Sequence, residues 1–356
     1  MTANPKTVGL CIFLFLASAL ITLSLKQTHH GGTFLPGHRS SGHKGEVLTK
    51  QQQILQTHKV AFATFLAGST AAKDHTDEES AALNDEDDGY YLGTRVMAYQ
   101  LLHSKSAGTN NSIPFLVLCT RDVSKRKRDR LKRDGATIVL VERLDPGWVA
   151  SGIDRWKDVM TKLRLFQLVE YSKICFIDAD VLITAPLDGV FFDEATLTQA
   201  TLPSPQNIKD DEGPLPRTYM FATHADSWGY DHPYPPTTDL DYLNCGFFVF
   251  TPSLVLFDYY MSLTKLPGRF DPTFPEQNLL NYAHRRNGNM PWKVIWYGWN
   301  VNWPTEKDWR GGARSFHAKY WDGDPSHDPV LKAMWREQRA EMEGFHRGRD
   351  LEKIKG

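Results

Sequence analysis

Short apolar runs alternate with polar segments of helical character between residues 59 and 177. The predicted strands are Val60–Leu66, Ile113–Cys119, Ala136–Val141 and Lys173–Ile177, and the predicted helices cover residues 94–102, 124–135 and 158–171. Strands that are apolar along their whole length are buried on both faces, which is typical of a parallel sheet covered by helices. The pattern therefore predicts an α/β fold with a mainly parallel sheet.

Two aspartates interrupt the apolar run at the end of the fourth predicted strand, in the stretch KICFIDADVLI. Asp178 and Asp180 would be costly to bury without a positive partner. Ligands of open α/β sheets bind beyond the carboxyl ends of the strands, and paired carboxylates there suit Mg²⁺ or Mn²⁺. Because this triplet is common by chance and often only caps a turn, it leaves both a metal site and a structural role open.

The amino-terminal region differs from the rest of the chain. Residues 8–25 carry no charge and are just numerous enough to span a bilayer. We expect residues 1–26 to be an uncleaved signal anchor, although Ala17-Ser18-Ala19 also offers a signal-peptidase site. Residues 27–58, rich in Gly, His, Ser, Gln and Lys, are expected to form a flexible stem.

Composition narrows the class of partner. The chain has 41 Lys and Arg against 42 Asp and Glu, for a formal net charge of -1, so nothing indicates a nucleic-acid partner. Its four cysteines have no zinc or disulfide spacing and are expected to be buried thiols. We expect one folded domain, large enough to be an enzyme, over residues 59–325 and a charged helix or tail over residues 326–356.

Several stretches, in this order, resemble glycosyltransferase family 8, the glycogenin-like retaining enzymes with a GT-A fold. They are VAFATFLAG, YLGTRVMAYQLL, TKLRLFQLVEYSKICFIDADVLITAPLDGVF, LNCGFFVFTPS, PEQNLLN and FHAKYW, spanning residues 60–321. The resemblance implies a single GT-A domain with a Rossmann-like sheet. It also implies transfer of a sugar from a UDP-sugar to a glycan, glycolipid or glycoprotein acceptor.

The resemblance further implies a metal site. Asp178, Asp180 and His317 would bind Mn²⁺ or Mg²⁺, and two carboxylates with an imidazole are a reasonable ligand set for Mn²⁺. Lys319 would contact the diphosphate, but this chain reads Lys-Tyr-Trp where family members often have Lys-Pro-Trp. Outside the family context, His317 would be read as an ordinary surface or core histidine.

The resemblance assigns the remaining donor-site positions to Thr64, Tyr90, Lys162, Ala179, Asn244 and Gly246. Thr64 and Tyr90 would contact the uracil ring, and the neighbouring Tyr91 could take the place of Tyr90. Asn244 would hydrogen-bond sugar hydroxyls, and Gly246 would allow close backbone approach. The implied catalytic residues are Lys162, Glu276 and Gln277, with Lys162 stabilising the departing diphosphate. Glu276-Gln277 stands where many members have Asp-Gln, so the carboxylate arm is longer by one methylene.

The acceptor is expected along residues 202–238, a long loop-rich segment in which Trp228, Tyr230 and Tyr234 could stack on sugar rings. A second aromatic cluster, residues 296–304, would line the same site. The leading hypothesis is a type II Golgi membrane enzyme with a lumenal domain, or a secreted one if the signal is cleaved. The alternatives are a catalytically silent nucleotide-sugar-binding or scaffold protein of the same fold, and a metal-dependent phosphotransferase. The last would need its aspartates after the first strand, whereas here they follow the fourth.

Overall fold

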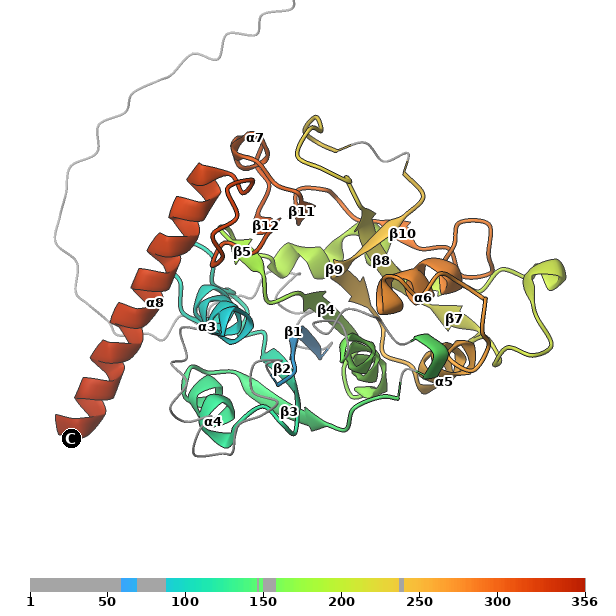
Figure 1. The fold of residues 1–356 in the computed structure, drawn as a ribbon, viewed down its shortest axis with the longest axis horizontal. Coiled ribbons are helices and arrows are strands. Elements are labelled where there is room, and N and C mark those ends of the chain that lie inside the picture. The colour runs from blue at the N-terminus through green and yellow to red at the C-terminus, as the bar shows by residue number, and fades with distance from the viewer. Residues whose placement is uncertain (1–58, 69–87, 146, 150–157, 237–239, 356) are drawn as a thin grey trace, which may run out of the picture. The chain divides into compact units, whose positions relative to one another are not determined.

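The computed structural model describes residues 59–68, 88–145, 147–149, 158–236 and 240–355 (Figure 1). The predicted anchor (1–26) and stem (27–58) lie outside these ranges, so both stay predictions. Within the described ranges, no helix combines the length and the apolar character needed to cross a membrane.

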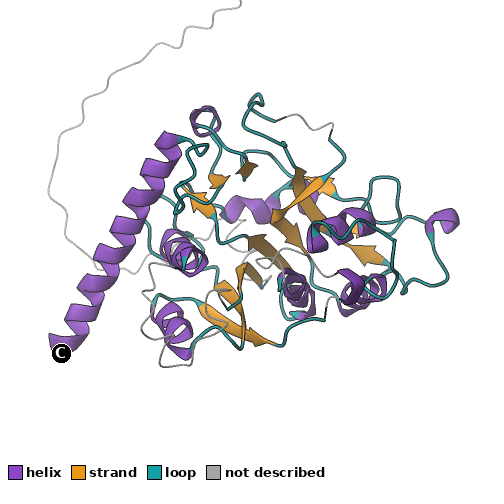
Figure 2. Cartoon of the chain, viewed as in Figure 1, coloured by secondary structure: helices purple, strands orange, loops and turns teal. Residues whose placement is uncertain are grey.

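The central sheet of the described part, whose strands are among the orange arrows of Figure 2, has the order β10-β8-β9-β4-β1-β2-β3 in a seven-stranded arrangement. The strands are β1 (Val60–Leu66), β2 (Phe115–Thr120), β3 (Thr137–Val141), β4 (Lys173–Ile177), β8 (Phe221–Ala225), β9 (Leu243–Phe250) and β10 (Lys293–Val294). Strands β1 to β4 are parallel neighbours, as predicted. Strand β9 pairs antiparallel with both β4 and β8, whereas β10 is parallel to β8, so the sheet is mixed.

Helices cover both faces of this sheet. One face packs against α3 (Gly89–Leu102), α4 (Lys125–Arg133) and the 3₁₀-helix η6 (Asp188–Phe192). The other packs against the 3₁₀-helix η5 (Val159–Gln167), α5 (Leu254–Leu263) and α6 (Pro275–Ala283). Side chains alternate between the two cores: Cys175 faces the first and Phe176 the second. Full burial of a phenylalanine such as Phe176 contributes about 2 kcal/mol to stability, so both cores hold the sheet in place.

Smaller elements lie around the sheet. A three-stranded sheet joins β11 (Val301–Asn302), β12 (Ser315–His317) and β5 (Val181–Ile183), and β6 (Gln199–Ala200) pairs with β7 (Thr218–Tyr219). The remaining elements are η3 (Gly147–Val149), η7 (Glu194–Thr196), η8 (Pro205–Asn207), α7 (Glu306–Arg310) and α8 (Pro329–Lys355). Helix α8, over the charged carboxyl-terminal segment, packs Leu331, Trp335 and Met342 beside apolar residues of α3.

The structure corrects two predicted elements. The helix expected over residues 158–171 is a 3₁₀-helix that ends at Gln167, and the Asp158 side chain makes no capping hydrogen bond at its start. The segment 202–238 is not a loop throughout, because it contains the fully buried strand β8. Sequence pattern missed β8 because Thr223 and His224 interrupt its apolar run. Both are buried with partners: Thr223 Oγ1 donates to Asn244 O at 2.7 Å, and His224 Nε2 lies 2.9 Å from Asn300 Oδ1.

Candidate active site

A cavity of about 310 Å³ lies where β1 and β4 end, at the carboxyl edge of the parallel strands. Its walls come from β1, the start of α3, η5, the loop after β4, the start of α6 and the end of β12. The lining residues are Phe65, Leu66, Ala67, Gly68, Asp88, Tyr90, Asp158, Val159, Lys162, Asp178, Ala179, Asp180, Phe274, Pro275, Glu276, Gln277, His317 and Lys319. The structure thus brings together every residue predicted for the metal, the donor and catalysis except Thr64, Asn244 and Gly246, whereas none of the predicted acceptor aromatics lines this cavity.

Strand pairing brings His317 to the two aspartates. Strand β12 pairs antiparallel with β5, so His317 lies opposite Val181, directly after the Asp-Ala-Asp stretch. His317 Nε2 lies 3.0 Å from Asp180 Oδ1 and 3.9 Å from Asp178 Oδ2. One donor atom from each of the three side chains falls within 4.8 Å of the others. Two carboxylates and an imidazole at this separation fit a hard divalent cation such as Mn²⁺ or Mg²⁺.

A glycine makes room for the His317 ring. The backbone N–H of Asp178 donates to Gly246 O at 2.8 Å, which holds β9 against the end of β4. A Cβ atom at position 246 would overlap Cε1 and Nδ1 of His317. The close approach expected of Gly246 is therefore to the histidine of the triad, and any larger residue would displace that ring.

Two lysines neutralise the carboxylates of the cavity. The Lys162 ammonium is buried and donates to Asp178 Oδ1 and Glu276 Oε1, both at 3.1 Å. Burial alone lowers the pKa of Lys162, but the carboxylates of Asp178 and Glu276 more than offset this, so its pKa is raised. Lys319 Nζ donates to Asp180 Oδ2 at 2.9 Å, and Asp180 raises the pKa of Lys319. Both lysines are therefore cations at neutral pH.

Asp180 stays ionised despite being buried. Burial by itself raises the pKa of its carboxyl, but Lys319 and His317 outweigh burial, and the pKa lies well below the ordinary value. The carboxylate is thus in the charge state that a metal ligand needs.

Tyr90 and Gln277 also line the cavity. The Tyr90 ring is 40% exposed, packs edge-on against Trp321 at 5.3 Å between centroids, and has Lys319 Nζ 5.9 Å from its centre. Gln277 Oε1 accepts from the backbone N–H of Cys245 at 3.0 Å, which fixes its amide. An exposed ring offers a stacking face to a planar base.

Three predicted site residues stand outside the cavity lining. Thr64 is fully buried in the middle of β1. Asn244 lies behind the triad: its Oδ1 accepts from Gly246 N at 2.8 Å, and its Nδ2 donates to Asp226 Oδ2 at 3.1 Å. Asn244 and Gly246 thus support the His317 side of the site from β9.

Sequence reasoning missed two acidic residues near the site. Asp88 lines the cavity and caps α3, accepting from Tyr91 N at 3.1 Å and from Lys127 Nζ at 2.5 Å. Its position just before a helical run was a signal that could have identified it. Asp226 follows β8 and is buried, but nothing in the sequence pattern distinguishes it from other loop aspartates.

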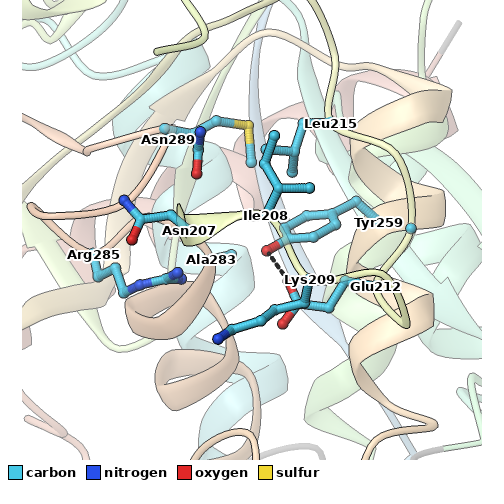
Figure 3. A pocket seen from close by; sticks show the side chains of 11 residues that line it. Asn207, Ile208, Lys209, Glu212, Leu215, Tyr259, Ala283, Arg285 and Asn289 are labelled. Carbon is cyan, nitrogen blue, oxygen red and sulfur yellow. Dashed lines mark hydrogen bonds between the residues drawn. The ribbon is translucent and has the colours of Figure 1, made fainter. Parts of the chain in front are cut away.

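A second cavity does not compete for this role. It holds about 10 Å³, near the volume of a single water probe, and shares no lining residue with the larger one. Figure 3 shows Tyr259 and Glu212 facing each other there, joined by a hydrogen bond of 3.1 Å. Of these two cavities, only the larger has room for more than a single water molecule.

Comparison with known proteins gives relatives but no matching family model. A protein of Schizosaccharomyces pombe without an assigned activity is 29% identical over 292 residues, covering 74% of this chain and 77% of the relative. Galactinol synthase 1 of Solanum lycopersicum is 25% identical over 249 residues (65% and 63%), and human glycogenin-1 is 26% identical over 203 residues (54% and 45%). Among solved structures, the galactosyltransferase LgtC superposes with a TM-score of 0.47 at 12% identity, covering 79% of this chain and 95% of that one.

Galactinol synthase and glycogenin are members of glycosyltransferase family 8. The chain is thus related to this family, and the resemblance predicted from its motifs is confirmed. The predicted enzyme class, a glycosyltransferase, is confirmed by the same relatives.

Proposed function

We propose that this protein is a metal-dependent, retaining glycosyltransferase of the GT-A type that moves a sugar from a UDP-sugar to a carbohydrate-containing acceptor. One observation carries the proposal. A single cavity holds the Asp178, Asp180 and His317 triad, two lysine ammonium groups and an exposed tyrosine ring. These are the groups that a metal-bound diphosphate joined to a base requires.

Each part of the donor would meet a matching part of the cavity. The uracil ring would pack on Tyr90, and Lys162 and Lys319 would place their charges beside diphosphate oxygens. Glu276, held by Lys162, and Gln277, held by Cys245 N–H, would face the donor sugar from the start of α6. The rigid placement of these groups would orient the anomeric carbon before an acceptor arrives.

The leaving group would depart without protonation by a carboxylic acid. Asp178, Asp180 and His317 would hold Mn²⁺ or Mg²⁺, which when bound neutralises charge on diphosphate oxygens. Lys162 is buried and would add a fixed positive charge, and electrostatic stabilisation is strongest where the charge is shielded from water. Its ion pairs to Asp178 and Glu276 would hold it in position before the donor binds.

The direct test is UDP release by the protein from a panel of UDP-sugars, with Mn²⁺, with Mg²⁺ and with EDTA. We expect one donor to be turned over only when a divalent cation is present. Asp180→Asn should lower that rate about 100- to 1,000-fold, because the conservative change removes a charge from the donor site. Asp129→Asn is the matched control, because Asp129 lies on the outer helix α4, where it pairs with Lys125.

Two results would contradict the proposal. One is UDP release that is the same with EDTA as with Mn²⁺. The other is tight UDP-sugar binding with no turnover in the presence of any acceptor tested, which would favour the silent binding protein instead.

A further inference from the structure

Two exposed tryptophans adopt a backbone conformation that is unusual for a large residue. Trp228 has φ 59° and Trp303 has φ 55°, both in the left-handed region. This region is costly for residues with a Cβ atom, and glycine or asparagine usually occupies it. The two indoles are nevertheless 57% and 42% exposed, so burial in the core does not explain their placement. Strain of this kind clusters at ligand-binding sites.

One buried carboxylate holds both tryptophans. Asp226 Oδ1 accepts from the backbone N–H of Trp228 at 3.0 Å and from the indole Nε1–H of Trp303 at 3.3 Å. The same oxygen accepts from Asn302 Nδ2 at 2.6 Å, and Oδ2 accepts from Asn244 Nδ2 at 3.1 Å. Asp226 is only 8% exposed. The carboxylate therefore holds the backbone of Trp228 and the indole ring of Trp303.

Tyrosines pack against both indoles. The Trp228 and Tyr242 rings lie 4.9 Å apart at 36°, and the Trp303 and Tyr230 rings lie 5.2 Å apart at 86°. These contacts add to the hold of Asp226 and leave indole surface exposed to solvent. The result is a fixed aromatic surface, which loses little conformational entropy when a ligand binds.

The same network reaches the metal triad. Asn302, just before Trp303, is paired with His317 in the β11–β12 ladder. Asn244 bonds both Asp226 and the N–H of Gly246, the residue that packs on the His317 ring. Neither tryptophan lines the donor cavity. The aromatic pair is thus joined to the site by two short routes through His317, but lies outside the space expected for the donor.

We propose that Trp228 and Trp303 form the stacking platform for the pyranose rings of the acceptor, with Asp226 as its positioning residue. This inference rests on the proposed function, and it names the acceptor as a saccharide bound through its C–H faces. Flat aromatic rings suit such faces, whereas a phosphate or another anion would need cations. The groups within hydrogen-bond distance of Asp226 are neutral amides, an indole and backbone.

Trp228→Gly separates a ligand-binding role from a structural one. Glycine relieves the left-handed strain and removes the ring, so the melting temperature should stay the same or rise. The KM for a saccharide acceptor should rise about 10-fold or more, because loss of one stacking contact costs about one order of magnitude in affinity. The KM for the UDP-sugar and the rate of UDP release without acceptor should not change.

Two further variants complete the set. Asp226→Asn should raise the acceptor KM with little change in donor KM, because an amide cannot accept all four N–H bonds. Trp309→Ala is the control: its indole, 37% exposed on α7, packs with the Arg310 guanidinium instead, and its backbone φ is not positive. The probes are methyl glycosides of glucose, galactose and xylose, together with maltose, lactose and cellobiose.

A binding measurement tests whether the two tryptophans bind a saccharide, independently of turnover. Titration of maltose, lactose and cellobiose, followed by tryptophan fluorescence, should saturate for the wild type and not for Trp228→Gly. If the wild type binds no saccharide, or if both variants keep wild-type acceptor KM and fluorescence titrations, the platform is wrong. Absence of UDP release from every donor would instead overturn the proposed function, and the titration would still decide on the platform.

Discussion

The donor cavity and the aromatic platform meet at His317 but are built from opposite materials. The cavity is lined by charges in close pairs, with Lys162 and Lys319 set against three carboxylates. The platform offers two neutral rings held by one carboxylate, Asp226, that is covered by N–H donors. Charged side chains in close pairs suit a charged ligand, which can take the place of one partner in a pair. Aromatic rings suit a neutral ligand instead.

The two regions also differ in which energetic cost they carry and in which interactions offset it. In the cavity, the cost of burying charge is offset by ion pairs between side chains far apart in sequence, such as Lys162 and Glu276. At the platform, the cost is backbone strain at Trp228 and Trp303, offset by hydrogen bonds to Asp226. A substitution in the cavity should therefore lower both stability and activity, while a suitable one on the platform lowers activity alone.

The largest combined loss of stability and activity is expected for Lys162→Met. Removing the ammonium leaves Asp178 and Glu276 without their buried partner, which should cost about 3 kcal/mol of unfolding free energy. UDP release should fall on the order of 100-fold, because a positive charge beside the leaving group is lost. Urea unfolding and UDP release measure the two effects. The double variant with Glu276→Gln should recover part of the stability and none of the activity; full recovery of activity would contradict the role of Lys162.

The core between β8 and α6 should weaken in acid. The buried His284 ring stacks on Phe221 of β8 and lies 2.6 Å from Tyr260 Oη, and burial lowers its pKa to about 4. Because the unfolded pKa is about 6.5, the unfolded chain binds the extra proton first as pH falls. The free energy of unfolding should keep its full value above pH 6.5 and decrease by up to about 3 kcal/mol as the pH falls towards 4.

Urea denaturation from pH 4 to 8 measures this loss, and His284→Gln should flatten it. His346, whose pKa burial also lowers to about 4, would account for the part that remains. If the free energy of unfolding of the His284→Gln variant depends on pH as strongly as that of the wild type, His284 is not the cause of the loss in acid.

Gly246→Ala tests the contact between the two regions. The added methyl group would overlap the His317 ring, so the triad should be displaced and cation-dependent UDP release should fall about 10- to 100-fold. The Mn²⁺ concentration for half-maximal activity should rise. Gly323→Ala is the control, because a Cβ there meets nothing within 4 Å. Equal Mn²⁺ dependence in both variants would show that the His317 position is not critical.

The smallest effect is expected from salt. Screening weakens interactions between charges, so the UDP-sugar KM should rise about threefold between ~0.05 and ~0.5 M NaCl. The saccharide KM should hold steady, because stacking involves no net charge. Steady-state kinetics at fixed Mn²⁺ would measure the KM for the UDP-sugar and the KM for the saccharide. An equal rise in both KM values would show that the two regions do not differ in their dependence on charge.

Sequence pattern located the residues of the cavity better than those of the aromatic platform. Strand β1 has the predicted bounds, and the aspartates lie at the end of β4 as expected, because buried parallel strands are apolar throughout. His317 followed only from the family resemblance, since its approach to Asp180 depends on pairing between β12 and β5. Such pairing between distant segments cannot be predicted from the spacing of residues along the chain.

The platform was less accessible to sequence reasoning. Trp228 was expected among acceptor aromatics, but its left-handed backbone and its link to Asp226 were not, because tryptophan gives no local signal for that conformation. Strand β8 was missed because Thr223 and His224 resemble loop residues until their buried partners are known. Polar groups satisfied by distant segments are where local pattern fails.

Helix α8 makes the carboxyl terminus part of the donor side. Its Leu331 and Trp335 pack in one apolar cluster with Leu92 and Val96 of α3, the helix whose first residues include Tyr90. A protein shortened to end before residue 329 would uncover that side of α3 and loosen the edge expected to hold the nucleotide base. Trimming α8 or fusing a rigid partner to it should therefore change the affinity for the proposed UDP-sugar donor without altering any residue that lines the cavity.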